Sequence, residues 1–272
     1  MYKNKLFGLI GGLAVGVHLV NASPDLQMQE VMVIGSTEQV QNLAGSGALI
    51  QSQQLSNEVI TDINQALKTI PGVYIREEDG SGLRPNIGIR GATSERGEKI
   101  TLMEDGVMIA PAPYSAPAAY YFPTAMRMSG IEVLKGAPLL RYGPQTTGGV
   151  INMISTPIPT EELSGSIEMI VGENDSIDIH AHVGGTKETS EGDWLWQIET
   201  VQRQSNGFKD IDRGGDSGFD IEDYVVKLGW KNDRQKVLLK YQDSDETSDE
   251  TYLGLTDSDF DADENRRYGF SK

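Results

Sequence analysis

From position 163 onward the sequence alternates apolar and polar residues with a period of two, a pattern that restricts it to β-strands with two unlike faces. Five segments carry the pattern: 163–171, 177–183, 194–199, 224–231 and 236–242. Aromatic side chains stand near several segment ends, which fits strands that meet lipid on one face and a polar barrel lumen on the other. A soluble sandwich would show the same period.

The connections between these segments favour the barrel. Segments 173–176 and 231–235 are short, whereas 205–220 and the stretch from 243 onward are long. If the first strand leaves the periplasm, both long connections fall outside the cell, and long outer loops with short inner turns are typical of outer-membrane barrels. We therefore expect residues 159–272 to contribute about five antiparallel strands to a transmembrane barrel.

The charge balance and the cysteine count exclude several classes of protein. The sequence has 23 Lys and Arg against 40 Asp and Glu, a formal net charge of −17, and no cysteine. An acidic chain lacks the basic face that neutralises phosphates, so we expect no nucleic-acid partner. Without cysteine there is no disulfide scaffold, zinc–thiolate site, iron–sulfur cluster or cysteine nucleophile.

The N-terminus has the features of a secretory signal peptide over residues 1–22. Lys3 and Lys5 precede an apolar run over 6–20, and Ala22 stands where a signal peptidase would cut. The run is shorter than the roughly 20 residues that a membrane-spanning helix needs. We therefore expect the chain to be exported to a bacterial envelope.

A polar leader over residues 23–44 contains one β-prone island, from Glu30 to Ile34. Five residues cannot build a core alone. The island can add a strand to the open sheet edge of a partner, where backbone hydrogen bonds supply the affinity. It can equally be the first strand of the domain that follows, and its position alone does not separate the two interpretations.

Residues 45–158 predict a small α+β domain, because the elements are short and mixed in order. Asp62 can cap a helix, with Gln65 at capping-box spacing, and a Pro-Gly pair ends that helix. The pair Asp105-Gly106 predicts a tight turn between two strands. Short strands are expected at 73–75, 86–91, 99–104, 107–109, 131–135 and 149–154, with a helical turn at 124–128.

No catalytic set stands out in the sequence, and we expect neither enzyme activity nor a cofactor. The glycine-rich stretch 143–149 lacks the Lys-Ser/Thr pair of a phosphate loop. His180 and His182 would face the lumen together, but two ligands without a third favour polar lining over a metal site. The acidic stretch 257–264 lacks the glycine and the glutamate of a calcium loop, and it predicts an exposed acidic loop.

Six motifs over about 90 residues resemble, in their order, the plug domain of the TonB-dependent outer-membrane receptors. Each motif is weak alone, and the shared order after a signal peptide carries the resemblance. The motifs are Ile70-Pro71-Gly72-Val73, Gly88-Ile89-Arg90-Gly91, Leu102-Met103-Glu104-Asp105-Gly106-Val107, Ile131-Glu132-Val133-Leu134-Lys135-Gly136, Arg141-Tyr142-Gly143 and Gly148-Gly149-Val150-Ile151-Asn152-Met153-Ile154.

The resemblance implies an α+β plug domain, a small mixed sheet with short helices, followed by the first part of a barrel of about 22 strands. The residues after 158 suffice for about five of these strands, so we expect an incomplete barrel. The resemblance also places the TonB box of the family at Glu30, Val31, Met32, Val33 and Ile34. The implied partners are TonB with its inner-membrane energising complex, outer-membrane lipid and a ligand.

Within the family the chain is most similar to the ferric citrate receptor type, through the stretches 112–114 and 141–145. This similarity implies a ferric chelate as ligand, either a siderophore or a ferric citrate-like compound. Ala116 stands where the ferric citrate type has a glutamine, which removes a hydrogen-bond donor. The candidate ligand-binding residues are Ser81, Arg84, Arg96, Tyr114 and Ser115.

We therefore expect a plug-gated outer-membrane receptor that takes up a ferric chelate with energy supplied through TonB. The alternative, from another class, is a module of the cell envelope that binds a ligand without transporting it.

Overall fold

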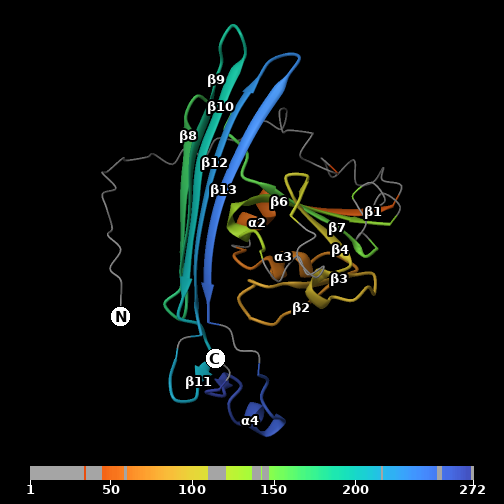
Figure 1. Ribbon diagram of the computed structural model, residues 1–272, viewed down its shortest axis with the longest axis vertical. Helices are drawn as coiled ribbons and strands as arrows, with labels where there is room; N and C mark the ends of the chain where they lie inside the picture. The colour runs from red at the N-terminus through yellow and green to blue at the C-terminus, as the bar shows by residue number, and fades with distance from the viewer. Residues whose placement is uncertain are drawn as a thin grey trace.

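The structure, a computed structural model, describes residue 34 and residues 45–57, 60–109, 121–136, 142, 147–215, 217–249 and 253–270. Two bodies lie side by side (Figure 1). One is a tall curved sheet from the second half of the chain, which we call the wall. The other is a smaller mixed α+β body from the first half, which we call the plug.

The wall is an antiparallel meander of five strands, in the order β13-β12-β10-β9-β8. Each strand coincides with one of the five segments of period two, which confirms the prediction. The strands are β8 (Ser164–Val171), β9 (Ile177–Lys187), β10 (Asp193–Ser205), β12 (Phe219–Lys231) and β13 (Lys236–Ser248).

The two faces of the wall differ as the period predicts. Apolar and aromatic side chains cover the outer face, with exposed fractions of 72% for Ile167, 59% for Trp194 and 64% for Leu239. The inner face, which carries the plug, is polar. Its buried polar side chains are Asp178, His180, Gln197, Glu199, Arg203, Asp223 and Lys227. An apolar outside and a polar inside are typical of a barrel wall.

The longer connections gather at one end of the wall (Figure 1). Strand β11 (Asp210–Ile211) lies between β10 and β12 and pairs in parallel with β14 (Arg266–Arg267), which follows β13. The turns between β9 and β10 and between β12 and β13 lie at the opposite end. Both long connections therefore share one end of the wall, which we call the loop end.

The acidic stretch 257–264 contains a short helix where the sequence predicts only a loop. Helix α4 (Asp257–Ala262) begins after Thr256, whose side chain accepts a hydrogen bond from the Asp259 N–H. Acidic residues in the first turn also favour a helix start, because they lie near the positive end of its dipole. The cap forms this exposed helix without an apolar face, so periodicity does not reveal it.

The plug is built on a second five-stranded sheet, in the order β1-β6-β7-β4-β5. Strands β4 and β7 are parallel, and the other neighbours are antiparallel. The strands are β1 (Ser46–Gln51), β4 (Ile100–Glu104), β5 (Val107–Met108), β6 (Met128–Lys135) and β7 (Gly149–Ser155). A two-stranded sheet of β2 (Val73–Arg76) and β3 (Asn86–Ile89) lies beside it.

The core of the plug fills the space between its main sheet, its short second sheet and helix α3 (Ile63–Lys68). Branched apolar side chains dominate the core, and their burial is the main favourable term in folding the plug. Fully buried members are Ala66, Leu67, Ile87, Ile89, Ile100, Leu102, Ile131, Val133, Ile151 and Met153. The helical turns η2 (Glu95–Gly97) and η5 (Ala125–Arg127) connect the strands.

The structure refines one local prediction in the plug and confirms another. Asp62 does cap helix α3, but its carboxylate accepts from the Asn64 N–H at 2.7 Å rather than from Gln65. The turn at Asp105 and Gly106 forms as predicted, with φ angles of 52° and 74° that suit an Asp-Gly pair.

The sequence misses the first two elements of the plug. It predicts no element between the leader and the helix that Asp62 caps, whereas β1 and helix α2 (Ser52–Asn57) occupy residues 46–57. Strand β1 pairs along its whole length with β6, for example Ile50 opposite Ile131. Its hydrogen bonds come from a strand about 80 residues later, so no local pattern announces it. Among the described residues, no helix has the length and apolar character needed to cross a membrane.

Candidate ligand site and plug contacts

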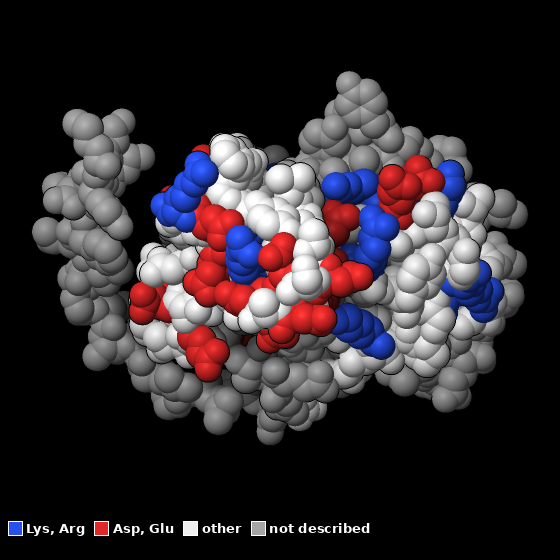
Figure 2. Space-filling model, turned by 90° about the horizontal axis from the view of Figure 1, so that it is seen from below, with Lys and Arg blue, Asp and Glu red and all other residues white. Residues whose placement is uncertain are grey.

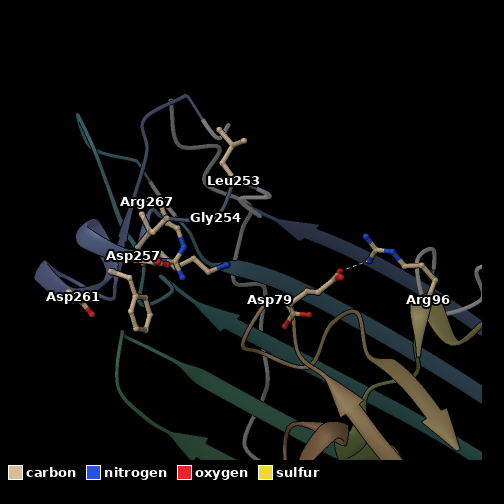
Figure 3. Close-up of a pocket in the computed structure, with 11 residues that line it drawn as sticks. Asp79, Arg96, Leu253, Gly254, Asp257, Asp261 and Arg267 are labelled. Carbon is tan, nitrogen blue, oxygen red and sulfur yellow. Dashed lines mark ion pairs between the residues drawn. The ribbon is translucent and has the colours of Figure 1, made fainter. Parts of the chain in front are cut away.

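A cavity of about 530 Å³ opens between the plug and the loop end of the wall (Figure 3). Plug residues line one side and residues of the long wall connections line the other. The plug supplies Glu78, Asp79 and Arg96; the wall connections supply Lys209, Leu253, Gly254, Leu255, Asp257, Phe260, Asp261 and Arg267. The mixture of charged, apolar and backbone groups suits a ligand that offers both polar and apolar surface.

The plug loop at this cavity is organised by the carboxylate of Asp79. It accepts hydrogen bonds from the backbone N–H groups of Ser81 at 2.6 Å, Leu83 at 3.2 Å and Arg84 at 2.9 Å. Gly80 has a positive φ of 82°, and an added Cβ there would approach the Phe208 ring to 2.8 Å. Asp79 therefore shapes the loop, and its charge is satisfied mostly by the loop itself.

Arg96 reaches the cavity from the neighbouring plug loop. Its backbone has a φ of 50°, and its N–H donates to the side chain of Asn86 at 2.9 Å. Its guanidinium lies 2.7 Å from the Glu78 carboxylate, the ion pair dashed in Figure 3. A carboxylate therefore already neutralises part of the positive charge that Arg96 offers to a ligand.

The wall side of the cavity is held together by Arg266. Its guanidinium lies 2.9 Å from Asp212 in the β10–β12 connection and 2.7 Å from Asp259 in α4. Tyr268 donates its hydroxyl hydrogen to Asp259 at 2.6 Å. The hydrogen bonds from Arg266 and Tyr268 hold the pKa values of Asp212 and Asp259 below their usual range, so both carboxylates stay ionised.

Acidic side chains dominate the loop end of the molecule. Viewed onto that end, Asp and Glu side chains form a broad group that scattered Lys and Arg side chains interrupt (Figure 2). Exposed members on and after α4 are Asp257, Asp261, Asp263 and Glu264. A negative surface of this kind attracts cations and repels anions at long range.

The structure brings together only part of the predicted ligand-binding set. Arg96 lines the cavity. Arg84 instead lies at the seam between plug and wall, with its guanidinium 2.7 Å from Glu246 of β13. Ser81 is half-buried in the Asp79 loop and does not line the cavity. Tyr114 and Ser115 lie outside the described residues.

A second cluster, deeper in the molecule, joins the plug to the wall around Arg127. This side chain is fully buried, and its two terminal nitrogens contact the Glu104 carboxylate at 2.5 and 3.0 Å. Its Nε lies 3.3 Å from Asp223 of wall strand β12, and it donates to the Tyr121 hydroxyl at 2.7 Å. A bidentate pair of this kind is among the stronger contacts available to a buried charge.

Two wall lysines complete this cluster. Lys240 of β13 contacts both Glu104 and Asp105, the latter at 2.6 Å. Lys227 of β12 donates to the Ser155 hydroxyl at 2.8 Å and to the carbonyl of Thr156. We call Glu104, Asp105, Arg127, Asp223, Lys227 and Lys240 the seam cluster. Cations and carboxylates from both bodies alternate in it, so it fixes the plug against the wall.

The surroundings of the plug carboxylates keep them charged. Burial alone would raise the pKa of Glu104, but hydrogen bonds and charge from Arg127, together with Lys240, lower it below its usual range. Asp105 behaves alike, because Lys240, Lys227 and Ser155 outweigh its burial and lower its pKa. Burial raises the pKa of Tyr121 to about 12, so this phenol stays protonated.

Of the predicted TonB box, the described residues include only Ile34, because Glu30, Val31, Met32 and Val33 lie outside them. Ile34 is 2% exposed and packs against Met103, Leu134, Val150 and Tyr142. Its backbone N–H donates to the buried Glu132 carboxylate at 2.8 Å.

Sequence reasoning misses both Asp79 and the seam cluster. The Asp-Gly-Ser-Gly order at 79–82 is a signal for an Asx-type loop, in which the aspartate bonds the backbone that follows. The seam cluster leaves no comparable signal, because its contacts between plug and wall join residues far apart in the sequence, 96 positions for Arg127 and Asp223 and 135 for Lys240 and Asp105.

A polar-faced wall that carries an α+β plug on its inner side defines the class of plugged outer-membrane barrels. Comparison with known sequences supports that class: the profile of the TonB-dependent Receptor Plug Domain matches residues 39–150. Residues 39–150 thus match the plug domain of the TonB-dependent receptors, a family whose members reside in the bacterial outer membrane.

Individual relatives agree with this assignment. The ferric citrate transporter FecA, in its unliganded crystal structure, superposes with a TM-score of 0.69 at 26% identity, over 86% of this chain and 36% of that one. The siderophore receptor PirA from Acinetobacter baumannii superposes with a TM-score of 0.61 at 24% identity, over 79% of this chain and 34% of that one.

A vitamin B12 transporter, BtuB of Vibrio vulnificus, is 25% identical over 278 aligned positions, which cover all of this chain and 42% of the relative. The chain thus spans less than half the length of the proteins it resembles. These relatives are transporters and receptors, not enzymes.

Proposed function

We propose that the chain supplies the plug and part of the wall of an outer-membrane receptor that takes up a ferric chelate, with energy supplied through TonB. One observation carries the proposal: the plug and the wall connections build the loop-end cavity jointly. A ligand bound there would touch both the fixed wall and the part that must move. That arrangement suits coupling between binding and gating.

The relatives support a metal-chelate class of ligand. The FecA and PirA names specify ferric citrate and siderophores, and the BtuB name specifies vitamin B12. Between these ligands the proposal favours a ferric chelate, because two of the three relatives named carry iron compounds. Vitamin B12 is the competing ligand, and it is an arm of the test below.

The test is uptake by cells that express the receptor as their only route for the ligand. Iron-labelled ferric citrate, a panel of ferric siderophores and cobalt-labelled vitamin B12 would be supplied to cells with and without TonB. We expect accumulation of one ferric chelate that stops in the absence of TonB while surface binding persists. Accumulation of vitamin B12 alone would contradict the iron assignment.

The same assay separates transport from the alternative of a non-transporting binding module. Such a module would bind a ligand at the surface equally with and without TonB and would never accumulate it inside. That result would overturn the transport proposal.

A further inference from the structure

Ile34, the leader residue that the structure describes, is seated on the plug at a buried carboxylate. Side chains alternate along a strand, so the main plug sheet has two faces. Along β6 and β7 the side chains on both faces are mostly buried. One face packs on the core with α3. The other face carries Glu132 and Leu134 of β6 and Val150 and Asn152 of β7. Ile34 packs on this second face. On this face Ile34 meets the plug.

Glu132 serves the leader and the sheet at once. Its Oε1 accepts the Ile34 N–H at 2.8 Å, and its Oε2 accepts the Asn152 side-chain amide at 2.8 Å. Glu132 and Asn152 face each other across β6 and β7, and neither is exposed. A buried carboxylate costs free energy unless hydrogen bonds satisfy it. Each hydrogen bond that Glu132 accepts therefore helps to keep it in the position that holds Ile34.

Asn152 extends this contact toward the wall. Its Oδ1 accepts the backbone N–H of Gly106 at 2.9 Å, in the turn between β4 and β5. The preceding residue of that turn, Asp105, contacts Lys240 of the wall at 2.6 Å. One amide side chain therefore touches both the carboxylate that holds the leader and the turn that rests on the wall.

We propose that Glu132 and Asn152 form a latch that holds the leader at Ile34, and that the latch is coupled to the wall through the β4–β5 turn and Lys240. Displacement of that turn withdraws the Gly106 N–H from Asn152, which reorients the amide and weakens its support of Glu132. The leader is then freed for a strand-adding partner. Asn152 is thus a positioning residue, and the inference rests on the proposed function only for the identity of that partner.

The absence of cysteine from this sequence permits a direct test. Ile34→Cys keeps the backbone N–H that Glu132 accepts and introduces a thiol at a position that is 2% exposed, so maleimide labelling reports release of the leader. Labelling rates would be measured on the receptor in outer membranes from cells without TonB. Neither transport nor the coupling partner then affects the readout.

Asn152→Ala in the Ile34→Cys background should speed labelling about tenfold, the effect of losing one charge-assisted buried hydrogen bond. Asn152→Asp keeps the shape and places a second carboxylate beside Glu132, so it should also speed labelling. Asn86→Ala is the matched control: this asparagine is equally buried in the plug, but it bonds Arg76 and Arg96 instead. The control should label within about twofold of the parent, because its bonds do not reach the leader.

Lys240→Met tests the coupling to the wall. It should speed labelling on its own, and combined with Asn152→Ala it should add little, because both changes act on one contact chain. Parental labelling rates in both Asn152 variants would overturn the latch. Equal acceleration by Asn86→Ala would show general loosening and would also overturn it. No effect of Lys240→Met would overturn the coupling. Uptake that does not need TonB would sink the proposed function and leave these labelling results intact.

Discussion

At the residue scale, Arg127 shows how a plug stays seated inside a polar wall. A buried guanidinium is tolerable because Glu104 meets it with two hydrogen bonds and Asp223 approaches its third nitrogen. Such an arrangement contributes less through its net energy than through the penalty for breaking it. The seam cluster therefore defines one position of the plug and disfavours others.

Replacing Arg127 tests this interpretation. Arg127→Met leaves Glu104 and Asp223 buried without their cation, and we expect a loss of about 3–5 kcal/mol in plug stability. The urea midpoint at which the plug becomes protease-sensitive in membranes would measure it. Arg76→Met is the control, because the Arg76 side chain is 61% exposed and its ion pair with Glu78 is superficial. Equal midpoints for Arg127→Met and the parent would contradict the account.

The carboxylates of the seam cluster also predict a pH dependence. The folded pKa values of Glu104 and Asp105 lie below the ordinary 4.5 and 3.8. Groups with a lowered folded pKa contribute stability that is complete above the ordinary pKa and is lost as the pH falls through the lowered value. We therefore expect these two groups to leave the urea midpoint unchanged between pH 8 and 5 and to lower it only below about pH 4.

Comparison with Glu104→Gln assigns that acid loss. The variant should start from a lower midpoint at neutral pH and show a shallower fall in acid, because the titrating group is gone. An equally steep fall in the variant and the parent would show that other carboxylates cause it.

At the element scale, the plug loop at 79–84 and helix α3 depend on each other. Gly82 has a φ of 79°, and an added Cβ would overlap the Asp62 carboxylate that caps α3. The loop that faces the cavity is therefore packed directly on a helix start. A substitution in the loop should therefore also destabilise the start of α3.

Gly82→Ala should consequently cost more than backbone strain alone. We expect a loss of about 2–4 kcal/mol in plug stability, against about 1–2 for Gly91→Ala, which has a similar φ of 80° but meets nothing within 4 Å. Urea midpoints of the two variants would give the difference. Equal losses of stability in the two variants would show that the contact with Asp62 adds nothing to the cost of Gly82→Ala.

The sequence predicts those elements whose formation depends on residues within or next to them. The five wall strands follow from alternation, the β4–β5 turn from Asp-Gly, and α3 from its aspartate cap. Strand β1 is missed because β6 stabilises it from a distance, and α4 is missed because a threonine cap forms it without an apolar face. Tertiary pairing and isolated caps therefore leave no periodic signal in the sequence.

At the scale of the whole molecule, the candidate site is harder to predict than the fold. Arg96 lines the cavity, whereas the Arg84 guanidinium pairs at the seam with Glu246, which lies 162 positions later in the sequence. The wall side of the cavity comes from connections that carry no motif, such as Phe260 and Leu253. A cavity formed by two bodies emerges only when both are folded and docked.

At this scale we propose that TonB drives uptake by pairing with the leader at residues 30–34. Proline removes a backbone donor and prevents strand addition, so Val33→Pro should abolish uptake while leaving ligand binding and surface levels unchanged. Gln27→Pro, in the same leader but outside the box, is the matched control and should transport normally. The decisive measurement is ligand accumulation in cells that express these two variants at equal levels. Loss of uptake in Val33→Pro alone supports the account, and parental uptake in Val33→Pro contradicts it.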